Sequence, residues 1–316
     1  MDRIPSVDLK DFISDDPSQK SQFVQSIGKA YEEIGFVALK GHFLDDNLVD
    51  NLYKQVKAFF NLPVNIKQKY EIPGIGGQRG YVSFGKESAK GKKEGDLKEF
   101  WHFGQYVENN EKLEKEYPKN VAVTELPDFN TVGKQTYRML EKTAKYVLRA
   151  LALFLDLEET YFDTYIHNGN SILRPIHYPP ILEEPNNAVR AAAHGDINLI
   201  TLLMGAQGRG LQVQNHKGEW IDAIAEPDEL MINVGDMLSR HTNNKLKSTI
   251  HRVINPPREL WGTSRYSIPF FMHPVSEMNL NVLDNCIDDN HPKLYEDITA
   301  GEFLNERLIE LGLIKK

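Results

Sequence analysis

The chain has 316 residues, of which 41% are hydrophobic and 26% are charged, and its formal net charge is −8. This composition lies in the globular range and excludes collagen-like, coiled-coil and wholly disordered chains. The negative balance argues against binding to a nucleic-acid backbone, and apolar runs such as Ala150–Leu155 are far too short to cross a bilayer.

The N-terminus and the cysteine content indicate where the protein works. The first residues, Met1 to Pro5, lack the apolar segment of a secretory signal. The single cysteine, Cys286, cannot form a disulfide within the chain, so nothing indicates an oxidising compartment. We therefore expect a cytoplasmic protein with a small-molecule partner and no nucleic-acid or membrane partner.

Residues 1–171 are expected to be mainly helical, with one or two core strands. Apolar residues at helical spacing predict helices over about 23–34, 48–59 and 128–155, and Phe36–Leu39 has the character of a buried strand. Residues 71–95 are rich in glycine and lysine and show no periodicity, which predicts a long, lid-like loop.

Residues 172–316 show a different sequence pattern. Short β-rich runs recur between turn residues, which favours an antiparallel sandwich or barrel. These runs are Leu199–Met204, Leu211–Gln214, Leu230–Val234, Thr249–Ile254 and Tyr266–Met272. A capping box from Thr299 to Glu302 then predicts a C-terminal helix. The fold class predicted is α+β with a mainly β core, flanked by N-terminal and C-terminal helices in one integrated unit.

Two separated segments of the β region carry metal-ligating residues. His194 and Asp196 are two residues apart, so on a strand they would share a face and reach one metal ion. His251 lies in an apolar, β-branched run, where an unpaired imidazole is costly to bury. Two histidines and a carboxylate form the facial triad typical of non-haem Fe(II) sites. The alternatives are a structural turn pair at 194–196, and His241, in a turn-like stretch expected to be exposed, as the third ligand.

Arg265 and Ser267 follow His251 on the next β-rich run. Strand alternation predicts that both point to one face, and a guanidinium beside a hydroxyl is a natural clamp for a carboxylate. A local arginine of this kind would allow an acidic protein to hold a dicarboxylate.

With these motifs the chain resembles the iron/2-oxoglutarate-dependent oxygenases of the isopenicillin N synthase-like group. The similarity also covers Ile4–Leu9, Gly35-Phe36, Arg79-Gly80-Tyr81, Asp96-x-Lys98-Glu99 and Tyr178-Pro179-Pro180, and so spans nearly the whole chain. The resemblance implies a double-stranded β-helix (jelly-roll) core, with Fe(II) held by His194, Asp196 and His251. It also implies 2-oxoglutarate held by Arg265, Ser267 and Tyr178, with O2 as the oxidant. One position departs from the pattern, because Ile176 stands where many members have Asn.

Substrate contacts are predicted from strand alternation and from the resemblance. Phe271 and His273 continue the inward face of the last β-rich run, and Arg174 shares a face with Tyr178. The other predicted contacts are Phe100, His102, Arg79 and Tyr81. The alternative for each of these residues is a purely structural role, as a core aromatic residue or a surface arginine. Together they would form a pocket for a small carboxylated or aromatic metabolite.

The function expected is hydroxylation of a small molecule by an Fe(II)- and 2-oxoglutarate-dependent oxygenase, with succinate and CO2 as co-products. An oxidase or cyclase of the same fold that does not consume 2-oxoglutarate can keep Arg265 and Ser267. A metal-binding jelly roll that senses a ligand without turnover is a third interpretation. A zinc hydrolase is disfavoured, because no second carboxylate is placed as a general base.

Overall fold

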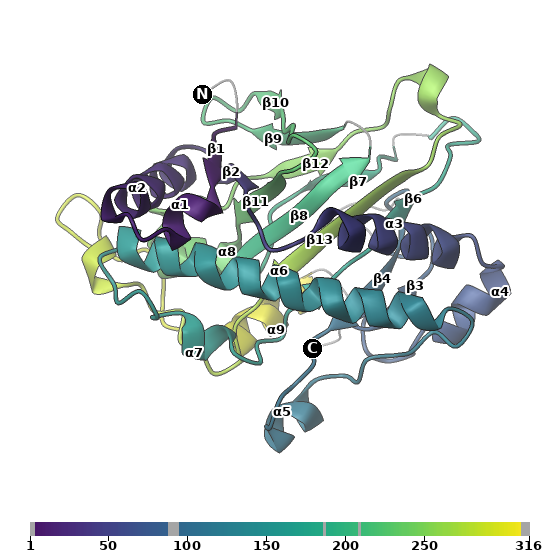
Figure 1. The fold of residues 1–316 in the computed structure, drawn as a ribbon, viewed down its shortest axis with the longest axis horizontal. Helices are drawn as coiled ribbons and strands as arrows, with labels where there is room; N and C mark the ends of the chain where they lie inside the picture. Colours follow the sequence, from purple (N-terminus) through teal and green to yellow (C-terminus); the bar gives the residue numbers. More distant parts are fainter. Residues whose placement is uncertain (1–3, 88–94, 186–187, 208–209, 311–316) are drawn as a thin grey trace.

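The computed structural model describes residues 4–87, 95–185, 188–207 and 210–310, and the described residues form two β-sheets and a layer of helices (Figure 1). The larger sheet has nine strands in the order β1-β2-β11-β8-β13-β5-β4-β3, with β6 paired to β13 and β4. The smaller sheet has four strands in the order β10-β9-β12-β7.

The strands are short and their pairing is mostly antiparallel, with β1 and β2 the parallel pair. Their bounds are β1 Ser6–Asp8, β2 Phe36–Lys40, β3 Gly80–Val82, β4 Glu99–Gly104, β5 Ile172–Leu173, β6 Ile176–Tyr178, β7 Ala191–His194, β8 Ile200–Gln207, β9 Leu211–Gln214, β10 Trp220–Asp222, β11 Leu230–Val234, β12 His251–Val253 and β13 Arg265–Met272. Strands β1 to β4 precede residue 172 but belong to the same sheet as β8, β11 and β13, so both halves of the chain share one core.

The two sheets face each other, as alternation along β2 shows. Val37 and Leu39 belong to the apolar cluster that contains the helices, whereas Phe36 belongs to the cluster that contains Val213 of the smaller sheet. The Phe36 ring also meets the His251 ring edge-on, with centroids 5.7 Å apart. Two facing antiparallel sheets are the arrangement of a jelly roll.

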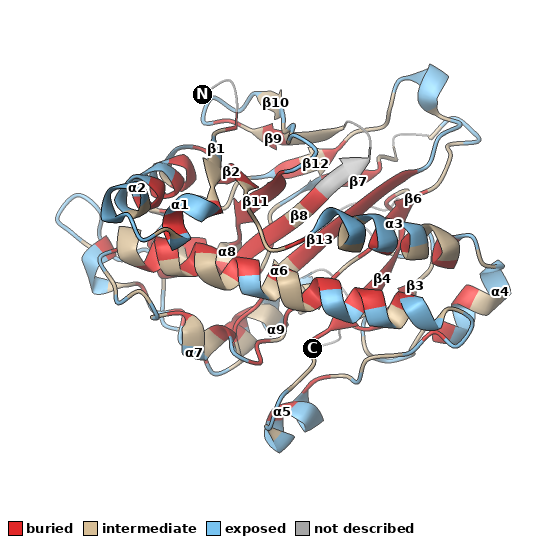
Figure 2. Cartoon of the chain, in the orientation of Figure 1, coloured by how far each residue is buried: buried red, intermediate tan, exposed pale blue. Residues whose placement is uncertain are grey.

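Helices α1, α2 and α6 contact strands of the larger sheet on its other face. The bounds of the helices are α1 Leu9–Ile13, α2 Pro17–Glu33, α3 Asp46–Phe60, α4 Val64–Lys67, α5 Glu111–Glu116, α6 Pro127–Phe154, α7 Asp163–Ile166, α8 Asp236–His241 and α9 Ala300–Glu310. The long helix α6 crosses this face and contacts α2, α3, β4, β8 and β13 (Figure 1). Its apolar stripe is buried, while the outer surfaces of α2 and α3 are exposed (Figure 2).

The segment predicted as a long loop at 71–95 contains one short strand, β3, which pairs with β4. Its residues 88–94 lie outside the described residues. At the other end of the chain, the capping box is formed: the Glu302 amide donates to the Thr299 hydroxyl, and the Thr299 amide donates to the Glu302 carboxylate. None of the helices in the described ranges is long and apolar enough to cross a membrane.

Candidate metal centre and ligand pocket

Three side chains converge at the edge of the smaller sheet. His194 ends β7, Asp196 follows two residues later, and His251 begins β12 directly opposite His194 in the ladder. One ligand atom from each residue lies within 4.8 Å of the others. Asp196 Oδ1 is 4.0 Å from His194 Nε2 and 3.8 Å from His251 Nε2. Asp196 lies beyond the end of β7, so the turn after the strand places its carboxylate, not strand alternation.

Both histidines are oriented through their other ring nitrogen. His194 Nδ1 donates to the carbonyl of Ala192 at 2.7 Å, and His251 Nδ1 donates to the carbonyl of Thr249 at 3.2 Å. These bonds fix the tautomer and leave each Nε2 as a lone-pair donor toward the shared space. Desolvation by the surrounding protein and the nearby His251 lower the pKa of His194 to about 4, although 42% of its side chain is exposed. A neutral imidazole is the form that binds a metal.

The Asp196 carboxylate is held by neutral donors on its other oxygen. Its Oδ2 accepts hydrogen bonds from the Thr201 hydroxyl at 2.6 Å and from the Asn233 amide at 2.8 Å. Burial alone would raise the pKa of Asp196, but the two histidines and these hydrogen bonds outweigh burial and lower it. The carboxylate is therefore anionic, with Oδ1 left for a ligand.

A buried cation, Arg265, lies on the larger sheet, which faces the sheet that carries this cluster. Arg265 pairs directly with Tyr178 in the β13–β6 ladder, and its guanidinium lies 5.0 Å from the centre of the Tyr178 ring. Arg265 is 2% exposed, and neither its Nε nor its Nη1 has a hydrogen-bond partner. Ser267, two residues later on the same strand, is also buried. An unpaired buried guanidinium is costly unless an anion completes the site.

Four predicted substrate contacts come together on one face of β4, β5–β6 and β13. The Arg174 guanidinium lies 4.5 Å from the centre of the Phe100 ring and 5.0 Å from that of Phe271. Its Nε donates to His102 Nε2, while His102 Nδ1 donates to the Gly77 carbonyl at 2.7 Å. Burial and the Arg174 charge hold the pKa of His102 well below its usual range, so this ring is neutral.

Arg79 and His273 extend this group. Arg79 is fully buried against Gly104, and its Nη2 donates to Asn170 at 3.1 Å. His273 is 8% exposed with an unpaired Nδ1, and burial lowers its pKa to about 4.

Tyr81 and His241 lie elsewhere. The Tyr81 ring packs against Phe59 on the helical side of the sheet and its hydroxyl donates to Glu99, so the structure does not bring Tyr81 to the pocket. His241 ends α8 away from the metal cluster. It is 2% exposed, so the expectation that its stretch is exposed was wrong. Its Nδ1 donates to the carbonyl of Asn281 and its Nε2 accepts from Tyr161.

A charged network beside Arg174 was not predicted. The Lys98 ammonium lies 2.8 Å from both Glu87 and Asp96, and Glu87 is also 3.4 Å from Arg174. Burial alone would raise the pKa of Glu87, but Lys98 and Arg174 outweigh it and hold the pKa far below the ordinary value. The Asp96-x-Lys98 spacing can be seen in the sequence, but the contact between Lys98 and Glu87 depends on the three-dimensional fold. The sequence also gave no indication of Arg190, whose guanidinium packs on the Tyr178 ring.

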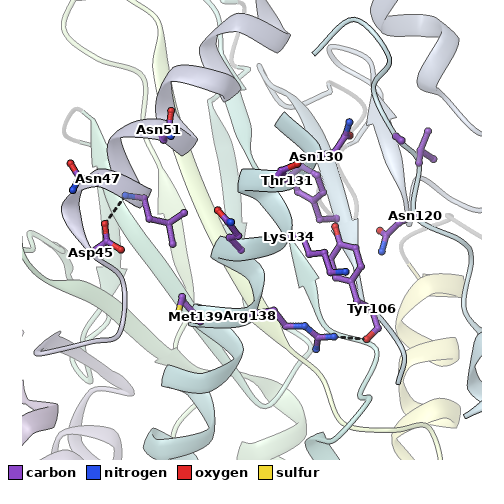
Figure 3. Close-up of a pocket in the computed structure, with 15 residues that line it drawn as sticks. Asp45, Asn47, Asn51, Tyr106, Asn120, Asn130, Thr131, Lys134, Arg138 and Met139 are labelled. Atoms are coloured by element: carbon purple, nitrogen blue, oxygen red, sulfur yellow. Dashed lines mark hydrogen bonds between the residues drawn. The ribbon is translucent and has the colours of Figure 1, made fainter. Parts of the chain in front are cut away.

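A cleft between two helices lies apart from these groups. It has a volume of about 930 Å³ and opens between α3 and α6, where Asn47, Asn51, Lys134 and Arg138 line it (Figure 3). No residue of the His194–Asp196–His251 cluster lines it.

Comparison with known proteins gives a consistent picture. Residues 4–125 match a family described as the N-terminal region of non-haem dioxygenases in morphine synthesis, and residues 169–274 match the 2OG-Fe(II) oxygenase superfamily. A proline hydroxylase of Petromyces alliaceus is 30% identical over 322 residues, which cover 97% of this chain and 99% of that protein.

Solved structures of oxygenases are also similar to this chain. A 2OG-Fe(II) oxygenase family protein from Caulobacter crescentus is similar with a TM-score of 0.89 and 42% identity, over 98% of this chain and 100% of the other. A Neurospora crassa protein solved with alpha-KG and thymine is similar with a TM-score of 0.85 and 27% identity, over 97% and 96% of the two chains.

Proposed function

Because the chain belongs to the 2OG-Fe(II) oxygenase superfamily, it is a dioxygenase that uses Fe(II), 2-oxoglutarate and O2, and we propose that it hydroxylates an unactivated C–H bond of a small-molecule metabolite. The observation that carries the proposal is the pairing of a His-Asp-His cluster on one sheet with an unpaired buried guanidinium on the facing sheet. In the proposed reaction 2-oxoglutarate is decarboxylated to succinate and CO2.

We assign the metal to His194, Asp196 and His251. The donor set fits Fe(II): two imidazoles and one carboxylate would hold the ion and leave coordination positions for other ligands. When bound there, Fe(II) supplies the site where the 2-oxo acid and O2 meet. The chain's own part is orientation, because backbone carbonyls fix both imidazoles and Thr201 and Asn233 fix the carboxylate.

We assign the far carboxylate of 2-oxoglutarate to Arg265 and Ser267, with Tyr178 beside them. The Nε and Nη1 of Arg265, which have no partner, leave the guanidinium with donors for a carboxylate. Ile176, in the position where Asn is frequent, is buried against Phe100 and Tyr178, so it contributes an apolar wall instead of an amide contact.

The prime substrate is proposed to lie against Arg174, Phe100, His102, Phe271 and His273, with Arg79 behind them. Neutral imidazoles, aromatic faces and a cation suit a small planar or carboxylated molecule. The Neurospora crassa relative was solved with thymine, a molecule of this size and shape.

The proposal is tested by succinate formation. Purified protein with Fe(II), 2-oxoglutarate and O2 is screened against small acids and heterocycles, and a true substrate should stimulate succinate release and gain one hydroxyl by mass spectrometry. Arg265→Met should abolish the stimulation. The matched control is Arg149→Met, which removes an arginine paired with Asp163 on the helical layer.

Two outcomes would refute the proposal. Substrate oxidation without succinate would identify an oxidase or cyclase that does not consume 2-oxoglutarate. Tight ligand binding without any turnover would identify a sensor.

A further inference from the structure

Two arginines, not one, are buried on the Tyr178 ring. Arg265 is 2% exposed and its guanidinium lies 5.0 Å from the ring centre, while Arg190 is 3% exposed and lies 5.9 Å from it. Arg190 immediately precedes β7, the strand that ends at His194. It therefore connects the smaller sheet, which carries the metal cluster, to the cationic end of the larger sheet.

Among the described residues, no carboxylate neutralises the positive charge of this pair. Arg190 Nη2 donates to the carbonyl of Thr263 at 3.2 Å, and its Nε has no partner; Arg265 has two unpartnered nitrogens. In the part of the chain that the structure describes, no carboxylate forms an ion pair with either guanidinium. Burial, followed by the charge of Arg265, lowers the pKa of Arg190 to about 10.

Two like charges buried together need an anion to complete them. The groups named here carry two positive charges and no negative one: two guanidiniums, the Ser267 hydroxyl and the Tyr178 side chain between them. The spacing between Arg190 and His194 also fits an anionic ligand. The two residues are four positions apart, which corresponds to about 13 Å of extended chain. An arginine side chain and a five-carbon diacid can together span this distance.

We propose that Arg190 is a second cation for the far carboxylate of 2-oxoglutarate and that it sets the preference of this site for dicarboxylate over monocarboxylate 2-oxo acids. This inference rests on the proposed function and adds a residue to the co-substrate pocket. A competing role is purely structural: Arg190 would only support the Thr263 carbonyl, two residues before Arg265. The two roles differ in whether its loss affects one class of ligand or all ligands.

The test is calorimetric binding to protein loaded with Mn²⁺, without O2 and without prime substrate. Two probes are compared: 2-oxoglutarate, and 2-oxopentanoate, which has the same chain length but no far carboxylate. Arg190→Gln should weaken 2-oxoglutarate binding about tenfold to a hundredfold, the range expected for a lost hydrogen bond between charged groups. It should leave the dissociation constant of 2-oxopentanoate within about twofold. Arg190→Lys, which keeps the charge, should recover part of the loss.

The controls make each outcome decisive. The ratio of the two dissociation constants does not depend on how much of a variant is folded, so a partly unfolded variant still reports on selectivity. An equal weakening of both probes in Arg190→Gln, or no change in either, would overturn the assignment of Arg190. If Arg265→Gln also left 2-oxoglutarate binding unchanged, the proposed co-substrate site itself would fail, and not only the role of Arg190. Arg149→Gln, in the helical layer, should change neither constant.

Discussion

Replacing Thr201 by valine tests how Asp196 is presented to the metal. The Thr201 hydroxyl donates to Asp196 Oδ2 at 2.6 Å, and Thr201 is 3% exposed, so water cannot replace the lost donor easily. Valine keeps the volume and the β-branched shape that suit strand β8. The variant removes the hydrogen bond to Asp196, together with the longer contacts of the hydroxyl with the Asn198 amide at 3.2 and 3.3 Å, and leaves Asn233 as the remaining donor to that oxygen.

The expected loss follows from the charge of the acceptor. A hydrogen bond to a charged group contributes about 1.5–3 kcal/mol, and about 1.4 kcal/mol corresponds to a factor of ten in a dissociation constant. Loss of the partner that orients a metal ligand weakens metal binding by about 10- to 100-fold in other proteins. We expect Thr201→Val to weaken Mn²⁺ binding by the same range.

The measurement is a titration of apoprotein with Mn²⁺ in competition with a chromophoric chelator. Thr136→Val is the matched control, because Thr136 is fully buried in α6 and its hydroxyl has no hydrogen-bond partner. The reasoning is refuted if Thr201→Val binds Mn²⁺ as tightly as the unaltered protein, or if Thr136→Val loses as much affinity.

Three further predictions concern stability. The pKa of His241 is about 4 in the fold, against about 6.5 in the unfolded chain, so its protonation lowers the free energy of unfolding as the pH falls from 6.5 to 4. In denaturant titrations, His241→Gln should remove at most about 3 kcal/mol of this loss of stability. Lys67→Met leaves the buried Glu99 carboxylate without its ammonium, 2.7 Å away, and should cost about 3–5 kcal/mol, whereas adding Glu99→Gln should recover much of it in thermal melts. Gly28→Ala places a methyl group 2.1 Å from Phe154 between α2 and α6; we expect a cost of about 1–3 kcal/mol, which Phe154→Leu should reduce.

The family and its cofactors could be predicted from the sequence, and the comparisons confirm them. The β-rich runs at 211–214 and 230–234 coincide with β9 and β11, because an alternating run and a mostly apolar run, respectively, are bounded there by clear turn residues. The run at 249–254 forms a shorter strand, His251–Val253, since only these residues pair with β7 and β9.

Side-chain direction was harder to predict than strand position. Arg79 and Tyr81 were both predicted as substrate contacts, but their surroundings differ: Arg79 lies against Gly104 and Asn170, whereas Tyr81 packs against Phe59. The residue between them, Gly80, has φ +74°, a left-handed conformation that interrupts the alternation of a strand. Nothing in the local sequence distinguishes this glycine from an ordinary strand residue.

The burial of a turn by a segment distant in the sequence could not be predicted either. The stretch after His241 has the composition of a turn, and Asn243 and Asn244 do adopt positive φ angles. A later segment covers this turn, and the Asn243 amide donates to the carbonyls of Cys286 and Pro292. Arg190 was missed for the same reason: its alanine-rich surroundings carry no pattern, and its significance depends on the position of Tyr178 in another sheet.

The charge distribution explains how an acidic chain can bind a doubly negative co-substrate. The net charge is −8, yet Arg265 and Arg190 are buried without a carboxylate partner among the described residues. Exposed charges are screened over about 10 Å in salt, whereas cations in a dry pocket act on a bound anion at lower dielectric. In the co-substrate site that we propose, the surface charge would affect how often 2-oxoglutarate reaches the protein, while the buried cations would determine how long it stays. Selectivity would then depend on the carboxylate at the far end of the ligand, which the arginines are proposed to bind.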